Sequence, residues 1–282
     1  MTPDFKPVLK CFLGCVLAAG LMLGTVSSGQ APAVGSAPSV PVVPVVPVVP
    51  VVPQKPRFVV VLDAAHGGDD GGGQIGASVA EKTVTLALSV RLRSLLAARG
   101  FAVVTTREGN VNLDSDARAQ IANRAVAPAG ASACLSLHAS QAGAGVHIFV
   151  SSLEPAAPTR FLAWKTAQSA YVSRSLKLAG TVNSALEHSS GAGGDSGEAN
   201  TGPIPATLAR ASLPGLDSMT CPALAIEVAP IRDADRKVVT EVTDPQYQTQ
   251  VVEALAAALL EWKTDVETES KPDSRGGGGT LP

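Results

Sequence analysis

Two histidines in the middle of the chain follow apolar runs that are typical of buried strands. His66 comes shortly after the run Phe58–Leu62, and His138 comes directly after the run Ala133–Leu137. In an open α/β sheet, ligands bind in the crevice beyond the carboxyl ends of the strands. We therefore expect both imidazoles to project into the same crevice at this edge of a sheet.

Two glutamates complete a set that could hold and use a metal ion. Glu81 opens a predicted helix, where the helix dipole favours an ionised carboxylate, and Glu227 lies near the end of a later predicted strand. Two neutral imidazoles and a carboxylate, with one position left for water, form the ligand set of a catalytic zinc site. These residues are far apart in the sequence, and polar residues at strand ends are more often ordinary loop residues, so spacing alone does not establish a metal site.

Alternating strands and helices must bring these residues together. Since parallel strands need a crossover helix, the alternation predicts an α/β fold with a largely parallel sheet. Residues 63–76 are predicted to form a glycine-rich loop, and residues 189–205 an exposed, mobile loop. From hydrophobic periodicity, the predicted strands are 58–62, 101–106, 133–137, 145–150 and 223–228, and the predicted helices lie around 84–95, 115–125, 161–186 (broken once) and 251–262.

The composition limits the function and the number of domains. The chain has 282 residues, 16% of them charged, with 22 Lys and Arg against 24 Asp and Glu. Without a basic arm, nucleic-acid binding driven by phosphate neutralisation is excluded as the main function. Composition changes near both ends leave a single predicted catalytic domain at residues 57–264.

The ends of the chain are predicted to lie outside that domain. Residues 1–28 resemble a secretory signal peptide, with an uncleaved anchor or a lipidated Cys15 as alternatives. Residues 29–56 form a Pro/Val-rich linker whose Pro-Val-Val repeats favour a semi-rigid polyproline II spacer. Residues 265–282 are predicted to be a disordered tail. We expect an exported protein of the periplasm or cell envelope, at a membrane only if the N-terminal segment is retained.

Cys134 and Cys221 are the two cysteines outside the predicted signal. An exported protein sits where a disulfide can form, but the spacing does not show whether these two pair. We favour two buried free thiols, with a disulfide as the alternative.

Six short sequences around the candidate residues occur in one order along the chain. Together they resemble the zinc-dependent N-acetylmuramoyl-L-alanine amidases (amidase type 3) of bacterial cell-wall remodelling, over about residues 57–263. The sequences are Asp63 to Gly71 (DAAHGGDDG), Glu81-Lys82, Thr106-Arg107, Ile121 to Ala125 (IANRA), Ser136 to Ala139 (SLHA) and Pro222 to Glu227 (PALAIE).

This resemblance implies a fold, a cofactor and a reaction. The implied fold is a single α/β domain with a mixed, mostly parallel sheet flanked by helices on both faces. His66, Glu81 and His138 would hold Zn²⁺, and Glu227 would be catalytic. The implied reaction cleaves the amide between the lactyl group of N-acetylmuramic acid and L-alanine of peptidoglycan. Zinc would activate a water and polarise the carbonyl, while Glu227 would move the proton to the leaving nitrogen.

The resemblance also implies partners. Peptidoglycan is the substrate partner. Some family members are silenced by an extra helix that covers the zinc and is displaced by an activator protein. Here Pro155–Ser169 is the candidate for such a covering segment, so an activator protein is a further candidate partner.

The sequence departs from the family pattern at several positions. Ala64-Ala65 stands where the family usually has Pro-Gly, and Val228 opens a segment that lacks the usual Gly-Phe pair. His147 stands where the family often has Glu, and we interpret it as structural. Asp70 matches a family position and would fix the loop that carries His66.

Two other functions stay open at this point. One is a non-catalytic peptidoglycan-binding module of the same fold. The other is a different zinc amide hydrolase, such as a peptidase, because the metal chemistry is shared and the pocket decides the substrate. A phosphate site in the glycine-rich loop is disfavoured, because neither GxGxxG nor a P-loop motif occurs there.

Overall fold

The computed structural model describes residues 58–129, 131–156, 163–189 and 202–270. The chain divides into two compact units, and all described residues lie in the second, which spans Val52–Pro282. The predicted signal peptide and linker lie outside the described residues, as do most of the predicted loop 189–205 and residues 271–282.

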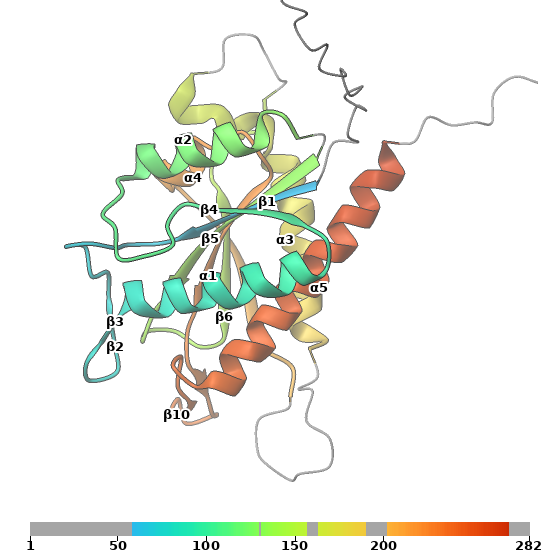
Figure 1. Cartoon of the computed structure of the whole chain (residues 1–282). Helices are drawn as coiled ribbons and strands as arrows, with labels where there is room; N and C mark the ends of the chain where they lie inside the picture. The colour runs from blue at the N-terminus through green and yellow to red at the C-terminus, as the bar shows by residue number, and fades with distance from the viewer. Residues whose placement is uncertain (1–57, 130, 157–162, 190–201, 271–282) are drawn as a thin grey trace, which may run out of the picture. The chain divides into compact units, whose positions relative to one another are not determined.

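The described residues form one six-stranded sheet with the strand order β4-β1-β5-β8-β6-β7 (Figure 1). The first four of these strands are parallel, whereas β6 runs antiparallel to β8 and β7 runs parallel to β6. The sheet is therefore mixed and mostly parallel, as expected. Its strands are β1 (Phe58–Ala64), β4 (Ala102–Thr105), β5 (Ala131–Ala139), β6 (Val146–Ser151), β7 (Ala206–Ala211) and β8 (Ala223–Val228).

Helices cover both faces of the sheet, as the resemblance implied (Figure 1). Residues of α1 (Glu81–Ala98), α3 (Val172–Glu187) and α5 (Pro245–Glu269) share the larger core cluster with one face of the strands. Residues of α2 (Ser115–Val126) and α4 (Pro214–Asp217) pack on the other face. Because side chains alternate between the faces of a strand, every second residue of β1, β5 and β8 points towards α2 and α4.

Most predicted elements are confirmed with small shifts of their ends. The break expected in the helix 161–186 occurs at Tyr171, between the 3₁₀ helix η1 (Trp164–Ala170) and α3. Asp114 caps α2 by accepting a hydrogen bond from the amide of Ala117, as Ser, Thr, Asp and Asn do at helix starts. The predictions missed β7 and two short hairpins, β2 (Gln74–Ile75) with β3 (Val79–Ala80) and β9 (Ile231–Arg232) with β10 (Val238–Thr240).

Two expectations need correction. The tail was expected to begin at residue 265, but α5 continues to Glu269, because Val266 is still buried against the core. Cys134 and Cys221 were expected to be free thiols, but they form a disulfide with a Cα–Cα distance of 6.2 Å. Cys134 on β5 lies beside the start of β8, which Cys221 precedes by two residues, so the sheet brings the two sulfurs together.

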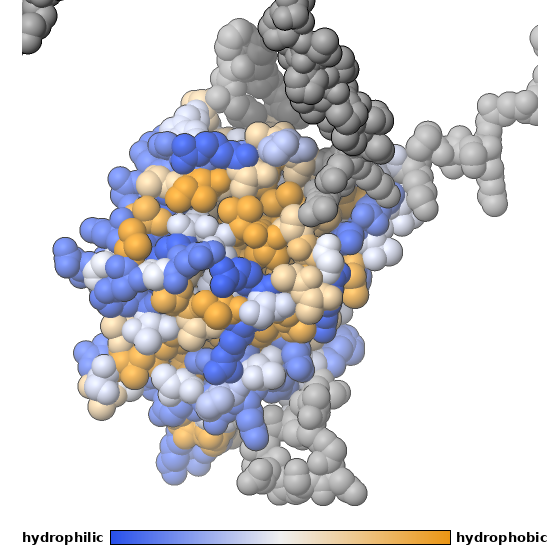
Figure 2. All heavy atoms as spheres, in the orientation of Figure 1, coloured by the Kyte–Doolittle hydropathy of each residue, from blue (hydrophilic) through white to orange (hydrophobic). Residues whose placement is uncertain are grey.

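The surface does not single out a site by its hydropathy. Figure 2 shows apolar patches interspersed among hydrophilic residues on the face seen in Figure 1. Scattered exposed apolar residues are normal for folded proteins. Within the described ranges, no helix combines the length and the apolar character needed to cross a membrane.

Candidate active site

The structure brings three of the four predicted site residues together at the carboxyl ends of β1 and β5. Glu81 Oε2 lies 3.2 Å from His66 Nε2, and Glu81 Oε1 lies 3.2 Å from His138 Nδ1. One ligand atom from each residue falls within 4.8 Å of the other two. The two imidazole rings are nearly perpendicular, with centroids 5.6 Å apart. This arrangement offers two imidazole nitrogens and a carboxylate oxygen to one point in space.

His66 sits at a strained position immediately after β1. Its φ of 61° lies in the left-handed region, which residues with a Cβ rarely adopt. The family's usual Pro-Gly is absent here, and the chain turns at His66 itself after Ala64 and Ala65. Such a conformation persists only where the surroundings hold it in place.

A glycine-rich loop lets the backbone approach the side chains of His66 and Glu81 closely. Gly72 has a φ of 67°, and a Cβ at this position would lie 2.6–2.7 Å from the His66 ring and 2.7 Å from Glu81 Oε2. Gly73 donates its amide to Glu81 Oε2 at 2.8 Å. The loop therefore packs against the side chains of His66 and Glu81 so closely that no larger residue would fit at position 72.

The outer nitrogen of His66 is held by a carboxylate. His66 Nδ1 lies 2.8 Å from Asp70 Oδ2, and the hydrogen bond lowers the pKa of Asp70. The Nε2 atom on the other side of the ring faces Glu81. A carboxylate in this outer position is the usual orienting partner of a metal-binding histidine.

Glu81 is ionised despite its burial. Burial by itself would raise the pKa of this carboxyl, but hydrogen bonds with His138 and the amides of Gly73 and Ala139 lower it to about 2. A buried carboxylate with this pKa is available as an anionic ligand at neutral pH.

Two arginines fix the backbone that presents His66. Arg107 donates to the carbonyl oxygens of Ala64 and Ala65, and Arg118 donates to those of Ala64 and His66. Burial is the main cause that lowers the pKa of Arg107, with the charge of Arg118 adding to it. Both guanidinium groups hold the left-handed turn in place from the side of α2 and the loop after β4.

Asp63 compensates the charge of Arg118 inside the protein. Its Oδ1 accepts hydrogen bonds from Arg118 at 2.8 Å and Thr106 at 2.6 Å, and its Oδ2 accepts one from Ser136 at 2.8 Å. The sequence alone does not predict a role for these residues. Asp63 at the end of β1 was the one signal in the sequence that could have indicated these buried contacts, because a charged residue inside an apolar strand needs a buried partner.

Glu227 lies beside this group on the next strand. It is the register partner of His138 on β5 and of His147 on β6. Register partners share a face of the sheet, so His138, Glu227 and His147 form a row on the side of α2 and α4. Glu227 is half-buried and is not one of the three converging residues. The Nε2 atom of His147 is buried under Gly143 and has no hydrogen-bond partner in the described part of the chain.

A pocket of about 390 Å³ opens beside His66 and His138. Its floor is formed by Ser136 and Ala225 of the sheet. Its two walls come from the start of α2 and from α4 with the residues around it. The wall residues are Asn112, Leu113, Asp114, Ser115 and Arg118 on the first side, and Leu213, Pro214, Gly215, Leu216 and Met219 on the second.

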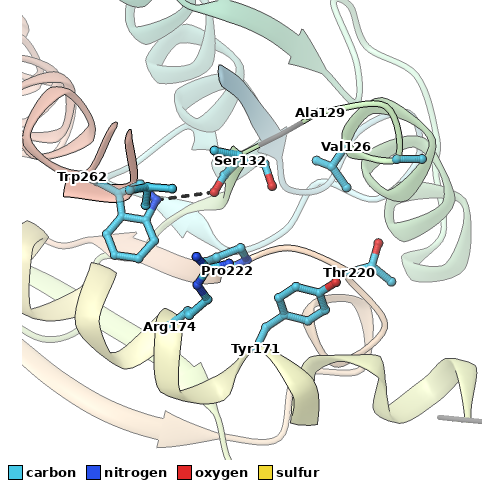
Figure 3. A pocket seen from close by; sticks show the side chains of 11 residues that line it. Val126, Ala129, Ser132, Tyr171, Arg174, Thr220, Pro222 and Trp262 are labelled. Atoms are coloured by element: carbon cyan, nitrogen blue, oxygen red, sulfur yellow. Dashed lines mark hydrogen bonds between the residues drawn. The ribbon is translucent and has the colours of Figure 1, made fainter. Parts of the chain in front are cut away.

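A second pocket, of about 280 Å³, lies at the amino ends of the strands, where β5 begins and where Pro222 precedes β8 (Figure 3). Tyr171, Arg174 and Trp262 line it, and the indole nitrogen of Trp262 donates to the carbonyl of Ser132 at 3.4 Å. None of the four predicted site residues lines this pocket, so it is separate from the candidate site.

Comparison with known proteins identifies the family. The family model described as N-acetylmuramoyl-L-alanine amidase matches residues 60–261, a range that includes all four predicted site residues. The chain belongs to this family. Its enzyme class is accordingly that of the N-acetylmuramoyl-L-alanine amidases.

A curated member of the amidase family matches a short part of the chain. The germination-specific N-acetylmuramoyl-L-alanine amidase of Bacillus subtilis (strain 168) is 42% identical over 55 residues. That match covers 20% of this chain and 23% of the curated relative, so it spans less than a quarter of the relative's length.

Solved amidase structures share the fold. The catalytic domain of CwlV from Bacillus (Paenibacillus) polymyxa var. colistinus is 22% identical, with a TM-score of 0.53, over 74% of this chain and 99% of that chain. The CwlD amidase from Clostridioides difficile, solved in complex with the GerS lipoprotein, is 18% identical, with a TM-score of 0.51, over 74% and 99% of the two chains. At these identities the likeness concerns the fold alone.

The candidate covering segment of this amidase domain lies partly outside the described residues, at 157–162. Its described part, η1, packs against α4 and α3. Gln168 of η1 donates to the carbonyls of Met219 and Cys221. No described residue of Pro155–Ser169 lines the 390 Å³ pocket, and the regulatory role of this segment stays a prediction.

Proposed function

We propose that this protein is a zinc-dependent amidase that hydrolyses the bond between N-acetylmuramic acid and L-alanine in peptidoglycan. The observation that carries the proposal is the convergence of His66, Glu81 and His138 on one point beside Glu227. Two imidazoles and one carboxylate fit the donor set of a catalytic zinc site, which keeps a position for a fourth ligand. Alternative metals with oxygen-rich sites, such as Mg²⁺ and Ca²⁺, fit this donor set less well.

The residues of the chain would have distinct roles. His66 Nε2, His138 Nδ1 and the Glu81 carboxylate would hold the ion, and Asp70 would keep His66 in the required tautomer. Bound zinc would supply a Lewis acid that activates a water molecule and polarises the amide carbonyl. Glu227 would accept the proton of the attacking water and deliver it to the L-alanine nitrogen as the bond breaks.

Peptidoglycan is the proposed partner, and cell-wall remodelling, daughter-cell separation or recycling are the proposed processes. A cell-wall substrate supports a location in the periplasm or cell envelope. An activator protein is a proposed second partner, supported by the related CwlD amidase, whose structure is in complex with a lipoprotein. The predicted signal peptide at residues 1–28 belongs to the same proposal.

Two measurements on the purified full chain test the function. We expect close to one zinc ion per chain by metal analysis, and release of stem peptides from purified sacculi that stops in Glu227→Ala. If sacculi bind but no peptide is released by the zinc-loaded wild-type protein, the chain is a binding module instead. If peptides are cut internally while the muramyl bond survives, it is a zinc peptidase.

A further inference from the structure

The 390 Å³ pocket beside the three converging residues suits one half of a substrate better than the other. Ser136 of β5 and Ala225 of β8 form its floor. They lie on the same face of the sheet as His138 and Glu227 and precede them by two residues along their strands. A group bound there would lie next to His66 and His138. The volume is in the range of small-molecule sites.

The two walls differ in chemistry. The wall around α4 is apolar, with Leu213, Leu216 and Met219. The opposite wall carries the amide of Asn112 and the hydroxyl of Ser115, both on exposed residues. An acetamido sugar has apolar ring faces and a methyl group, with hydroxyl and amide groups at its rim. One apolar wall facing one polar wall matches this pattern.

The charge of the pocket disfavours an acidic ligand away from the proposed metal position. Three carboxylates line it, and because Asp63 is paired with Arg118, the exposed ones of Asp70 and Asp114 are those that a ligand would meet. Arg118 is the one cation among its lining residues, all of which are described. Each guanidinium nitrogen of Arg118 already donates to a protein oxygen, belonging to Leu113, Asp63, Ala64 or His66. Away from the proposed metal position, a ligand carboxylate would therefore meet like charges without a free side-chain cation to offset them.

The two halves of a muramyl peptide differ in their charge. The carboxyl of N-acetylmuramic acid is consumed in the amide bond, so the sugar half is neutral. The stem peptide carries free carboxylates from its acidic second residue onward. We propose that the pocket between α2, α4 and the sheet binds the N-acetylmuramic acid half, and that the stem peptide extends away from it. The substrate named here rests on the proposed function.

The apolar wall is rigid enough to act as a preformed subsite. Asp217 of α4 accepts hydrogen bonds from Ser151 and from the amide of Leu213. Asn123 of α2 donates to the carbonyl of Ser218 and accepts from the amide of Thr220. The disulfide ties Cys221, two residues after Met219, to β5. These contacts hold a helix of four residues in a fixed place next to α2.

Binding measured without turnover tests this assignment. The full chain carrying Glu227→Gln, loaded with zinc, is titrated calorimetrically with N-acetylmuramyl-L-alanyl-D-isoglutamate and with L-alanyl-D-isoglutamate. The added substitution Leu213→Ala changes a partly exposed residue of the apolar wall. We expect it to lower the affinity for the muramyl compound about tenfold and the affinity for the dipeptide less than twofold. Asn112→Ala, on the exposed opposite wall, should also lower the affinity for the muramyl compound more than the affinity for the dipeptide.

Leu176→Ala is the matched control, because Leu176 is a partly buried leucine of α3 on the other face of the sheet. It should leave both affinities unchanged. The inference is overturned if Leu213→Ala lowers the affinity for the dipeptide as much as the affinity for the muramyl compound. It is also overturned if Leu213→Lys raises the affinity for the dipeptide, or if neither compound binds. A wild-type protein that binds the sugar half in this pocket but releases no peptide would contradict the proposed function and leave the pocket assignment standing.

Discussion

At the residue scale, the site depends on protonation states that the surroundings impose. Asp70 contacts His66 Nδ1 and orients the ring, and the amides of Gly73 and Ala139 help to keep Glu81 ionised. Both effects prepare the inward-facing atoms for a cation before any ion binds. The residue types could be predicted from the sequence, because each of the three stands at the end or start of a predicted element. The contact of Asp70 with His66 and the amide contacts could not, because they depend on the path of the loop 67–73.

Asp70→Ala should lower zinc affinity by about 10- to 100-fold, because His66 loses the partner that orients its ring. Competition with a chelator of known affinity measures the change. Asp69→Ala provides the matched control in the same exposed loop and should leave zinc affinity unchanged. Equal losses in both variants would show that the loop, and not the Asp70 carboxylate, determines the affinity.

Glu227→Gln should lower kcat by about 10²- to 10⁴-fold, the usual contribution of a general acid and base, while the zinc content stays the same. The side chain keeps its size and loses its ability to accept a proton. Initial rates of stem-peptide release and metal analysis of the same preparation check both parts. Loss of zinc in this variant would instead make Glu227 a ligand.

At the element scale, the loop after β1 is held by elements from distant parts of the sequence. Arg118 of α2 reaches carbonyls and a carboxylate that lie 52 to 55 residues earlier in the chain. Hydrophobic periodicity predicts α2 but does not show that one of its arginines is buried. The helix and strand positions were therefore predictable, whereas the polar contacts between them were not.

Arg118→Met should destabilise the metal-free protein by about 3 kcal/mol, because Asp63 would stay buried without its cationic partner. Zinc affinity should fall as well, since the strained turn at His66 loses a support. Urea unfolding measures the first effect. Arg124→Met, an exposed arginine on the same helix, should change the free energy of unfolding by less than about 0.5 kcal/mol.

The disulfide links β5 to the segment between α4 and β8 across 87 residues of sequence. The double variant Cys134→Ala and Cys221→Ala should therefore lose about 2–5 kcal/mol of stability. Unfolding of both proteins under non-reducing conditions measures this loss. Identical stabilities, together with two titratable thiols in the unfolded wild-type protein, would show that the cysteines are free.

At the scale of the whole molecule, the sequence patterns predicted the fold class and the edge of the sheet where the candidate site lies, and the family resemblance implied the helices on both faces. The sequence patterns failed at the margin of the sheet. β7 is exposed along most of its length and holds one large apolar residue, Leu208, so it lacks the buried run by which strands are recognised. The end of α5 was placed too early, because its last turns carry many charged residues around Val266. These two errors concern elements away from the candidate site, whereas the missed hairpin β2–β3 leads directly into Glu81.

The central claim is that the site hydrolyses one bond, between the lactyl carbonyl of N-acetylmuramic acid and L-alanine. Mass spectrometry of the soluble products, after digestion of purified sacculi by the zinc-loaded protein, tests it most directly. We predict stem peptides that begin with a free L-alanine amine and carry no sugar, and none from the Glu227→Gln protein. Soluble products that retain muramic acid on the peptide would contradict the account.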